Sequence, residues 1–245
     1  DYEVHFVVDS RDDPAWPLVE QAIEETQSTH ASIQEFHDLP ENGIVNCTNS
    51  KVVQALRALS KDSVEIIAMA DGDVVADENW LRDLVTPLVR DDSIGVTYGN
   101  RWFVPPRFRM GTLVRSLWNM AATSIMYHQN MPWGGCYATR MSAVRKGGLI
   151  EKWAKVGALD MFTTREMKRL GLKIEFVPTL MMVNREECGL PFSFNFIRRQ
   201  ITWAQLYNPV WPMAVLHSVL GAGMLATALI LLLIGVAQQL SLIHI

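Results

Sequence analysis

The chain has 245 residues, of which 49% are hydrophobic and 20% charged, and neither glycine nor proline is in excess. This composition excludes an intrinsically disordered chain and suffices for a substantial core, in one domain plus an appendage. The formal net charge of −4 is spread unevenly, since residues 1–92 carry 20 acids and 6 bases whereas residues 93–150 carry 7 bases and no acid.

The first half of the chain alternates strand-like and helix-like segments. Apolar and β-branched runs predict strands at 3–9, 32–36, 64–70 and 94–98. Apolar periodicity predicts helices at 17–26, 51–60 and 78–89. This alternation is typical of an α/β protein with a largely parallel, doubly wound sheet. Ligands of such sheets bind at the carboxyl ends of strands, which is where the sequence places Asp9 and the pair Asp71 and Asp73.

The second half adds helices and a long apolar tract. We expect a helix at 115–127, a glycine-rich turn at 133–135, a helix at 160–170 and a strand at 174–177. The second of these helices begins with Asp160 as an acidic N-cap and closes at Gly171. Residues 191–212 are aromatic and basic, which suits a helix lying in a membrane interface.

The tract at 213–237 has no charged residue apart from the titratable His217. It exceeds the roughly 20 apolar residues that cross a bilayer as a helix. We therefore expect a transmembrane helix there. The alternative is a buried core helix, although such helices are usually shorter.

The acid-free segment 93–150 suits an anionic ligand or a membrane surface, and equally an ordinary solvated face. No nucleic-acid-binding module accompanies this charge, so we expect no nucleic-acid partner. The cysteines Cys47, Cys136 and Cys188 have no paired spacing. We interpret them as buried thiols rather than as a zinc site or a disulfide framework.

Asp71-Gly72-Asp73 directly follows an apolar strand. Two carboxylates one residue apart can hold a hard divalent cation such as Mg²⁺ or Mn²⁺ together with substrate phosphates. Acidic turns of this kind are also common on ordinary surfaces. The position at a strand end favours the metal site, with Asp73 and Asp71 as its ligands.

Five segments in order resemble one enzyme family. The run AMADGDVVADENWL is similar to the metal-binding strand end of inverting glycosyltransferases of family 2 and its relatives, which include ceramide glucosyltransferases and cellulose and hyaluronan synthases. The other segments are VVDSRDD, the stretch around Lys51, WGGCYATR and LDMFTTREMKRLGLKIEFVP, and the resemblance spans residues 3–211. It implies a GT-A fold (Rossmann-like, with a mostly parallel sheet), a nucleotide-sugar donor such as a UDP-sugar, and Mg²⁺ or Mn²⁺.

The resemblance also implies roles for individual residues. Asp160 is the catalytic base that takes the proton of the acceptor hydroxyl, and Asp73 with Asp71 holds the metal. The acceptor side is the turn Trp133-Gly134-Gly135. Asp9 contacts the nucleotide base, and the nucleotide and donor are bound by Asp9, Lys51, Asp71, Arg199 and Trp203.

The chain departs from this family in two places. The family's last motif, Gln/Arg-x-x-Arg-Trp, is present here as Arg199 to Trp203 with Thr202 in place of the second arginine, which usually helps to hold the diphosphate. The nucleotide-binding strand that normally precedes residues 3–9 is missing. Residues 240–245 (LSLIHI) resemble a translated sequencing adaptor. We expect a GT-A catalytic domain at 1–190 without its first strand, an amphipathic interfacial segment at 191–212, the transmembrane helix at 213–237, and a candidate non-native tail at 238–245.

The function expected from these features is that of a membrane-bound hexosyltransferase. It transfers glucose or a related hexose to a lipid or polysaccharide hydroxyl, with its catalytic domain on the cytoplasmic side of a bacterial inner membrane. One alternative is a nucleotidyltransferase, which also uses paired aspartates and metal but has no need of the Asp160 helix or the membrane anchor. The other is a catalytically degenerate, membrane-anchored binding or scaffold protein, which Thr202 and the missing strand favour.

Overall fold

The computed structural model describes residues 2–37, 47–59, 64–72, 74–208 and 211–237. The chain divides into two compact units, residues 1–203 and 204–245. Asp73 and the tail 238–245 lie outside the described residues.

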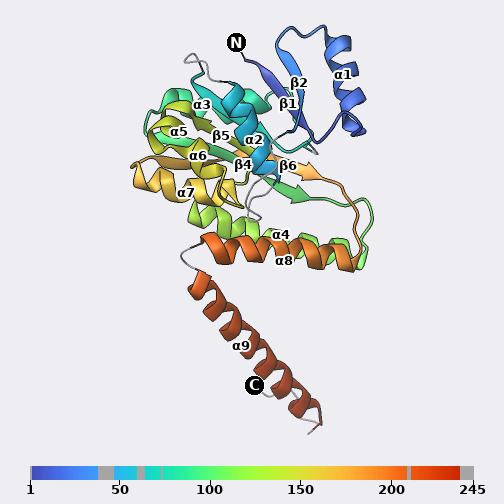
Figure 1. Cartoon of the computed structure of the whole chain (residues 1–245). Coiled ribbons are helices and arrows are strands. Elements are labelled where there is room, and N and C mark those ends of the chain that lie inside the picture. The colour runs from blue at the N-terminus through green and yellow to red at the C-terminus, as the bar shows by residue number, and fades with distance from the viewer. Residues whose placement is uncertain (1, 38–46, 60–63, 73, 209–210, 238–245) are drawn as a thin grey trace. The chain divides into compact units, whose positions relative to one another are not determined.

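Helices and strands alternate through the first unit as far as residue 140, and three consecutive helices then precede the last strand (Figure 1). The strands are β1 (Val4–Val8), β2 (Ala31–Glu35), β3 (Ile66–Ala70), β4 (Ile94–Phe103), β5 (Cys136–Arg140) and β6 (Lys173–Asn184). The helices are α1 (Ala15–Thr26), α2 (Cys47–Ala58), α3 (Trp80–Arg90), α4 (Met110–Gln129), α5 (Met141–Gly147), α6 (Leu149–Trp153), α7 (Leu159–Arg169), α8 (Leu190–Tyr207) and α9 (Trp211–Ala237). The predicted elements are all present, whereas β5, α5 and α6 were not predicted.

The sheets are mixed, so the prediction of a mostly parallel sheet was wrong. Among the described strands, β1 and β2 form a parallel pair, and the other four are ordered β3-β5-β4-β6. The strands β4 and β6 are parallel, but β5 runs antiparallel to both β3 and β4. The end of β5 is fixed by side chains, because the Thr139 hydroxyl donates to the carbonyl of Gly95 at 3.0 Å and Nε of Arg140 donates to that of Ile94 at 2.8 Å.

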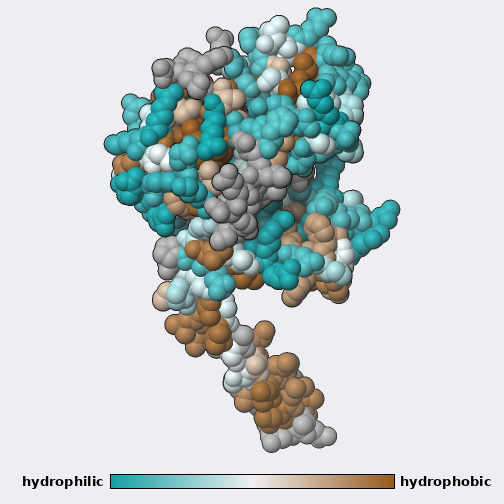
Figure 2. Space-filling view, viewed as in Figure 1, coloured by the Kyte–Doolittle hydropathy of each residue, from teal (hydrophilic) through white to brown (hydrophobic). Residues whose placement is uncertain are grey.

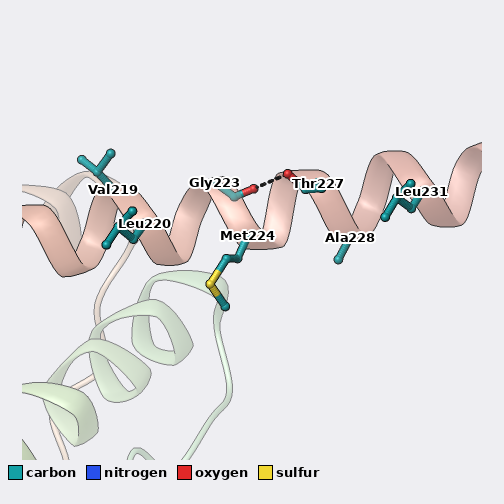
Figure 3. Close-up of a pocket in the computed structure, with 7 residues that line it drawn as sticks. All are labelled: Val219, Leu220, Gly223, Met224, Thr227, Ala228 and Leu231. Atoms are coloured by element: carbon teal, nitrogen blue, oxygen red, sulfur yellow. Dashed lines mark hydrogen bonds between the residues drawn. The ribbon is translucent and has the colours of Figure 1, made fainter.

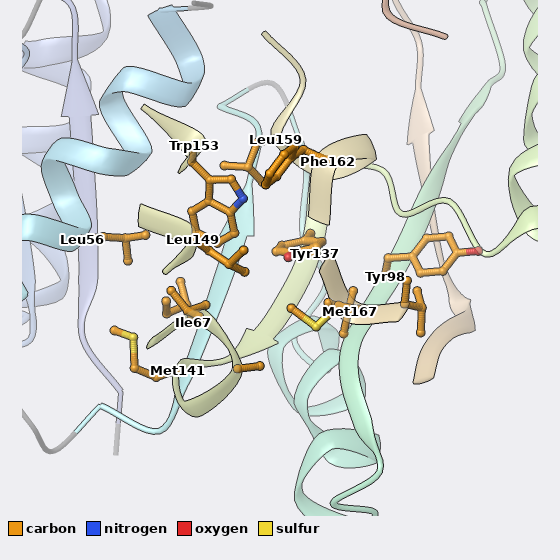
Figure 4. Close-up of a cluster of buried hydrophobic side chains, with 14 of the residues drawn as sticks. Leu56, Ile67, Tyr98, Tyr137, Met141, Leu149, Trp153, Leu159, Phe162 and Met167 are labelled. Carbon is orange, nitrogen blue, oxygen red and sulfur yellow. The ribbon is translucent and has the colours of Figure 1, made fainter. Parts of the chain in front are cut away.

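Two apolar clusters cover the two faces of the four-stranded sheet. One contains Leu84 and Leu88 of α3 together with Cys136 and Ala138 of β5. The other joins the opposite face of β5 to α2, α5, α6 and α7, with Tyr137 and Trp153 at its centre (Figure 4). Alternate residues of β5 thus face opposite clusters, as expected for a strand buried on both faces.

The first turns of α8 pack against α4. The hydroxyl of Ser193 donates to the carbonyl of Gly111 at 2.5 Å, and the rings of Trp118 and Phe196 lie 5.8 Å apart. The buried guanidinium of Arg115 forms an ion pair with the carboxylate of Glu186 and donates to its backbone carbonyl at 2.6 Å. These contacts fix the start of α8 within the unit that contains the sheet.

The helix α9 has a different character. It is long and apolar enough to cross a membrane, and no other helix in the described part of the chain meets that test. Hydrophobic residues cover most of α9, whereas hydrophilic ones dominate the surface around the sheets (Figure 2). A shallow hollow on α9 runs from Val219 to Leu231, where the hydroxyl of Thr227 donates to the carbonyl of Gly223 at 2.9 Å (Figure 3). Only α9 residues line it, so it belongs to the helix surface and includes none of the predicted site residues.

Candidate functional site

The turn before β5 contacts two of the predicted site residues. Asp71 follows β3, and its backbone N–H donates to the carbonyl of Gly135 at 3.3 Å. A Cβ on Gly135 would collide with the Asp71 carboxylate and with the Trp133 ring. The N–H of Gly134 donates to Oδ2 of Asp160 at 3.1 Å. The turn therefore contacts both a candidate metal ligand and the candidate base, which lie far apart in the sequence.

Asp160 is the second residue of α7, since the helix begins at Leu159 and its N-cap position is Ala158. The prediction that Asp160 is the N-cap was therefore wrong. Its Oδ1 accepts a hydrogen bond from the N–H of Met161 at 2.7 Å. Gly171, with φ of 73°, follows the end of α7 as predicted.

Burial raises the pKa of the Asp160 carboxyl group above its ordinary value. The N–H groups of Met161 and Gly134 and the charge of Arg101 act in the opposite direction. A raised pKa makes a carboxylate a stronger base, which is the property that a proton acceptor requires.

Arg101 is a site residue that the sequence analysis missed. It lines a small pocket together with Asp71, Val74, Trp133, Met182, Val183 and Asn184. Its guanidinium lies 5.3 Å from the ring centroid of Trp133 and 4.8 Å from that of Phe196. The sequence signals were its place in the acid-free segment and its position after the predicted strand 94–98. Neither signal predicts the contact with α8.

Two predicted donor-binding residues form an ion pair. Nζ of Lys51, on α2, lies 2.7 Å from Oδ1 of Asp9, which follows β1. Two residues before Lys51, the buried Asn49 donates from Nδ2 to the carbonyl of Val156 at 2.8 Å. The first turn of α2 is thus tied to the loop that leads into α7 and Asp160.

The last predicted motif lies on α8. The guanidinium of Arg199 is 5.8 Å from the ring centroid of Phe196, whose ring also faces Arg101. Trp203 lies one turn further along the helix and is half-buried. The hydroxyl of Thr202 donates to the carbonyl of Arg198 at 2.9 Å, a bond within the helix.

Of the two predicted metal ligands the structure describes Asp71, whereas Asp73 lies outside the described residues. Within the described ranges no three His, Cys, Asp or Glu side chains form a group that could hold a metal. The carboxylate of Asp71, beside the glycine turn and in the pocket, has the donor chemistry that Mg²⁺ and Mn²⁺ prefer. The described residues therefore contribute one carboxylate, that of Asp71, to the predicted metal site.

The arginines of the acid-free segment do not share one face. Arg115 is buried against Glu186, and Nη2 of Arg140 donates to the carbonyl of Asp91 at 2.9 Å. Nε of Arg107 and of Arg109 lie 3.9 Å and 3.3 Å from carboxylate oxygens of Glu187. Arg115 and Arg140 thus serve the fold, and Arg101 is the arginine of this segment that lines the pocket. Cys136 and Cys188 are free and buried, as predicted.

Comparison with solved structures gives distant matches. A crystal structure of a mycobacterial protein is 19% identical with a TM-score of 0.46, and the match covers 78% of this chain and 59% of that one. Glucosyl-3-phosphoglycerate synthase from Mycobacterium tuberculosis, in complex with Mn²⁺, UDP and glucosyl-3-phosphoglycerate, is 16% identical with a TM-score of 0.49. That match covers 82% of this chain and 68% of that one. At these values the matches assign no activity. No curated protein matches the chain.

The family is shown by a different comparison. The model of glycosyl transferase family 21 matches residues 1–245. The predicted class of enzyme, a glycosyltransferase, is thereby confirmed, whereas the predicted family 2-like assignment is not exact. The chain belongs to glycosyl transferase family 21.

Proposed function

We propose that the chain is the catalytic part of a membrane-bound, metal-dependent inverting glycosyltransferase. It takes glucose or a related hexose from a UDP-sugar and transfers it to a hydroxyl group of a lipid or polysaccharide. The observation that carries the proposal is the turn Trp133-Gly134-Gly135, which contacts Asp71 on one side and Asp160 on the other.

In the proposed reaction, ionised Asp160 accepts the proton of the acceptor hydroxyl as that oxygen bonds to the anomeric carbon. The bond from the anomeric carbon to the diphosphate oxygen breaks, and the nucleoside diphosphate leaves with the electron pair. Attack from the face opposite the leaving group inverts the configuration. The hydrogen bonds from Gly134 and Met161 hold the carboxylate of Asp160 in one orientation.

The remaining predicted residues serve the donor and acceptor. Asp71 and Asp73 would hold the Mg²⁺ or Mn²⁺ ion, which supplies positive charge to the diphosphate leaving group when bound. Asp71 thus contacts either this ion or the donor ribose. Asp9 contacts the nucleotide base, and Lys51, with which it forms an ion pair, takes part in binding the nucleotide and donor. Arg199 and Trp203, further along the chain, also bind the nucleotide and donor. Trp133, Gly134 and Gly135 form the acceptor side.

A transfer assay tests this function. The chain in detergent micelles, given radiolabelled UDP-glucose, Mn²⁺ and membrane lipid extract, is expected to form a labelled lipid or polymer product. Chelation of the metal with EDTA should abolish transfer, because the diphosphate is a poor leaving group without a cation. Absence of both transfer and donor hydrolysis, across UDP-, GDP- and dTDP-linked hexoses, would contradict the proposal.

A degenerate binding or scaffold protein is the second candidate. Thr202 favours this candidate, because the family that the sequence resembles has an arginine at this position. The hydroxyl of Thr202 donates within α8, to the carbonyl of Arg198. The same assay separates the two functions, since a scaffold neither transfers the sugar nor hydrolyses the donor.

We further propose that residues 213–237 cross the membrane and that 191–212 lie along its surface, with the catalytic domain at 1–190 on the cytoplasmic side. The apolar length of α9 supports this. After extraction with sodium carbonate, the chain should stay in the membrane pellet. A variant that ends at Pro212 should be released in large part. Full release of the intact chain would contradict the transmembrane assignment.

A further inference from the structure

Arg101 is held in place more firmly than a surface arginine. The ring centroids of Phe196, Trp133 and Phe103 lie 4.8, 5.3 and 5.6 Å from its guanidinium carbon. Its Nε donates to Oδ1 of the buried Asn119 at 3.4 Å, and its backbone carbonyl accepts from Nδ2 of the same residue at 3.0 Å. Contacts on this many sides leave the side chain little rotamer freedom, so its charge is positioned before any ligand binds.

In the proposed reaction negative charge develops on the diphosphate, beside the cation that Asp71 would hold. Arg101 and Asp71 line the same pocket, and the charge of Arg101 acts on Asp160 across the turn. A guanidinium stays protonated under all physiological conditions and presents a planar fork that matches phosphate oxygens. A fixed guanidinium next to a metal-ligand candidate has the charge and the donor geometry that a diphosphate requires.

Arg101 also differs from the other well-held arginines of its segment. Arg115 is buried with the carboxylate of Glu186, and Arg140 donates to backbone carbonyls. Neither of these guanidiniums lines the pocket that contains Asp71. The guanidiniums of Arg101 and Arg199 lie 4.8 and 5.8 Å from the centroid of the same ring, that of Phe196.

We propose that Arg101 binds the diphosphate of the nucleotide-sugar donor. It contributes there the positive charge that is missing at Thr202 on α8. The inference rests on the proposed function, because it requires a nucleoside-diphosphate donor.

The test is the affinity for UDP in the presence of Mn²⁺, measured by calorimetry on the full chain in detergent. Arg101→Gln is expected to weaken UDP binding by about tenfold to a hundredfold, because charge-assisted hydrogen bonds to the phosphates are lost. Uridine has no phosphate, so its affinity should not change. Arg101→Lys keeps the charge without the fork and should lose less than the Gln variant, so it serves as the probe if Arg101→Gln fails to fold.

Arg165→Gln is the matched control. Arg165 also stacks on an aromatic ring, 4.7 Å from the centroid of Phe162, but its side chain is 68% exposed and does not line the pocket. Its loss should leave UDP affinity unchanged. Equal weakening of UDP and uridine binding by the Arg101 variants, or no weakening, would overturn the Arg101 assignment while the proposed function stands. If the wild-type chain binds neither UDP, GDP nor dTDP, both proposals fail together.

Discussion

Asp160→Asn is expected to slow sugar transfer at least about a hundredfold, because general-base catalysis contributes about 10²–10⁴-fold. Asparagine has nearly the same shape but cannot take the acceptor proton. Its amide oxygen can still accept a hydrogen bond from Gly134 or Met161, the two donors to the carboxylate. The melting temperature and the UDP affinity should therefore stay close to those of the wild type.

The raised pKa of Asp160 refines this expectation. A buried acid whose folded-state pKa lies above its unfolded value costs stability when it is ionised at neutral pH. Removal of the charge should leave the fold as stable as before or more stable. Wild-type transfer should decline on acidification at a higher pH than an ordinary aspartate would give, since protonation removes the base. Near-normal transfer by the Asn variant, with the exposed Asp92→Asn as control, would reduce Asp160 to a structural residue of α7.

Elements with strong local patterns could be predicted from the sequence. The apolar run before Asp71 and the periodic segment before Arg90 became β3 and α3, because side-chain alternation and periodicity are local properties. The direction of β5 could not be predicted. Its five residues have no marked alternation, and its pairing with β3 and β4 joins segments about forty to seventy positions apart. Strand order of this kind depends on long-range packing that no local pattern records.

The same distinction holds for the site. Asp9, Lys51, Asp71 and Asp160 were identified as candidates because each belongs to a short motif. The sequence did not predict the ion pair between Lys51 and Asp9, in which Nζ lies 2.7 Å from Oδ1. Arg101 belongs to no motif and was counted only as one of several bases. Its place beside Trp133 and Phe196 depends on β4, the turn and α8 meeting in space.

Gly135→Ala is expected to lower transfer by about a hundredfold, the loss that a misplacement of roughly 1 Å can cause at a reacting centre. The added Cβ would lie 2.6 Å from Cε2 of Trp133, and closer still to Cζ2 of the same ring and to the Asp71 carboxylate. The Trp133 ring is rigid and stacks on Arg101, so the carboxylate or the turn must move. Overpacking of this kind also costs about 1–3 kcal/mol of stability.

The neighbouring Gly134→Ala is the matched control for this variant. A Cβ there would lie 3.4 Å from Oδ2 of Asp160, an ordinary contact, and its N–H remains able to donate to that oxygen. Neither glycine has a positive φ, so backbone strain does not separate the two substitutions. Transfer rate, UDP affinity with Mn²⁺ and melting temperature should be measured for both variants. We expect Gly135→Ala to lose UDP affinity through displacement of Asp71, whereas Gly134→Ala keeps it. Equal behaviour of the two variants would show that Asp71 and the turn are not coupled in donor binding.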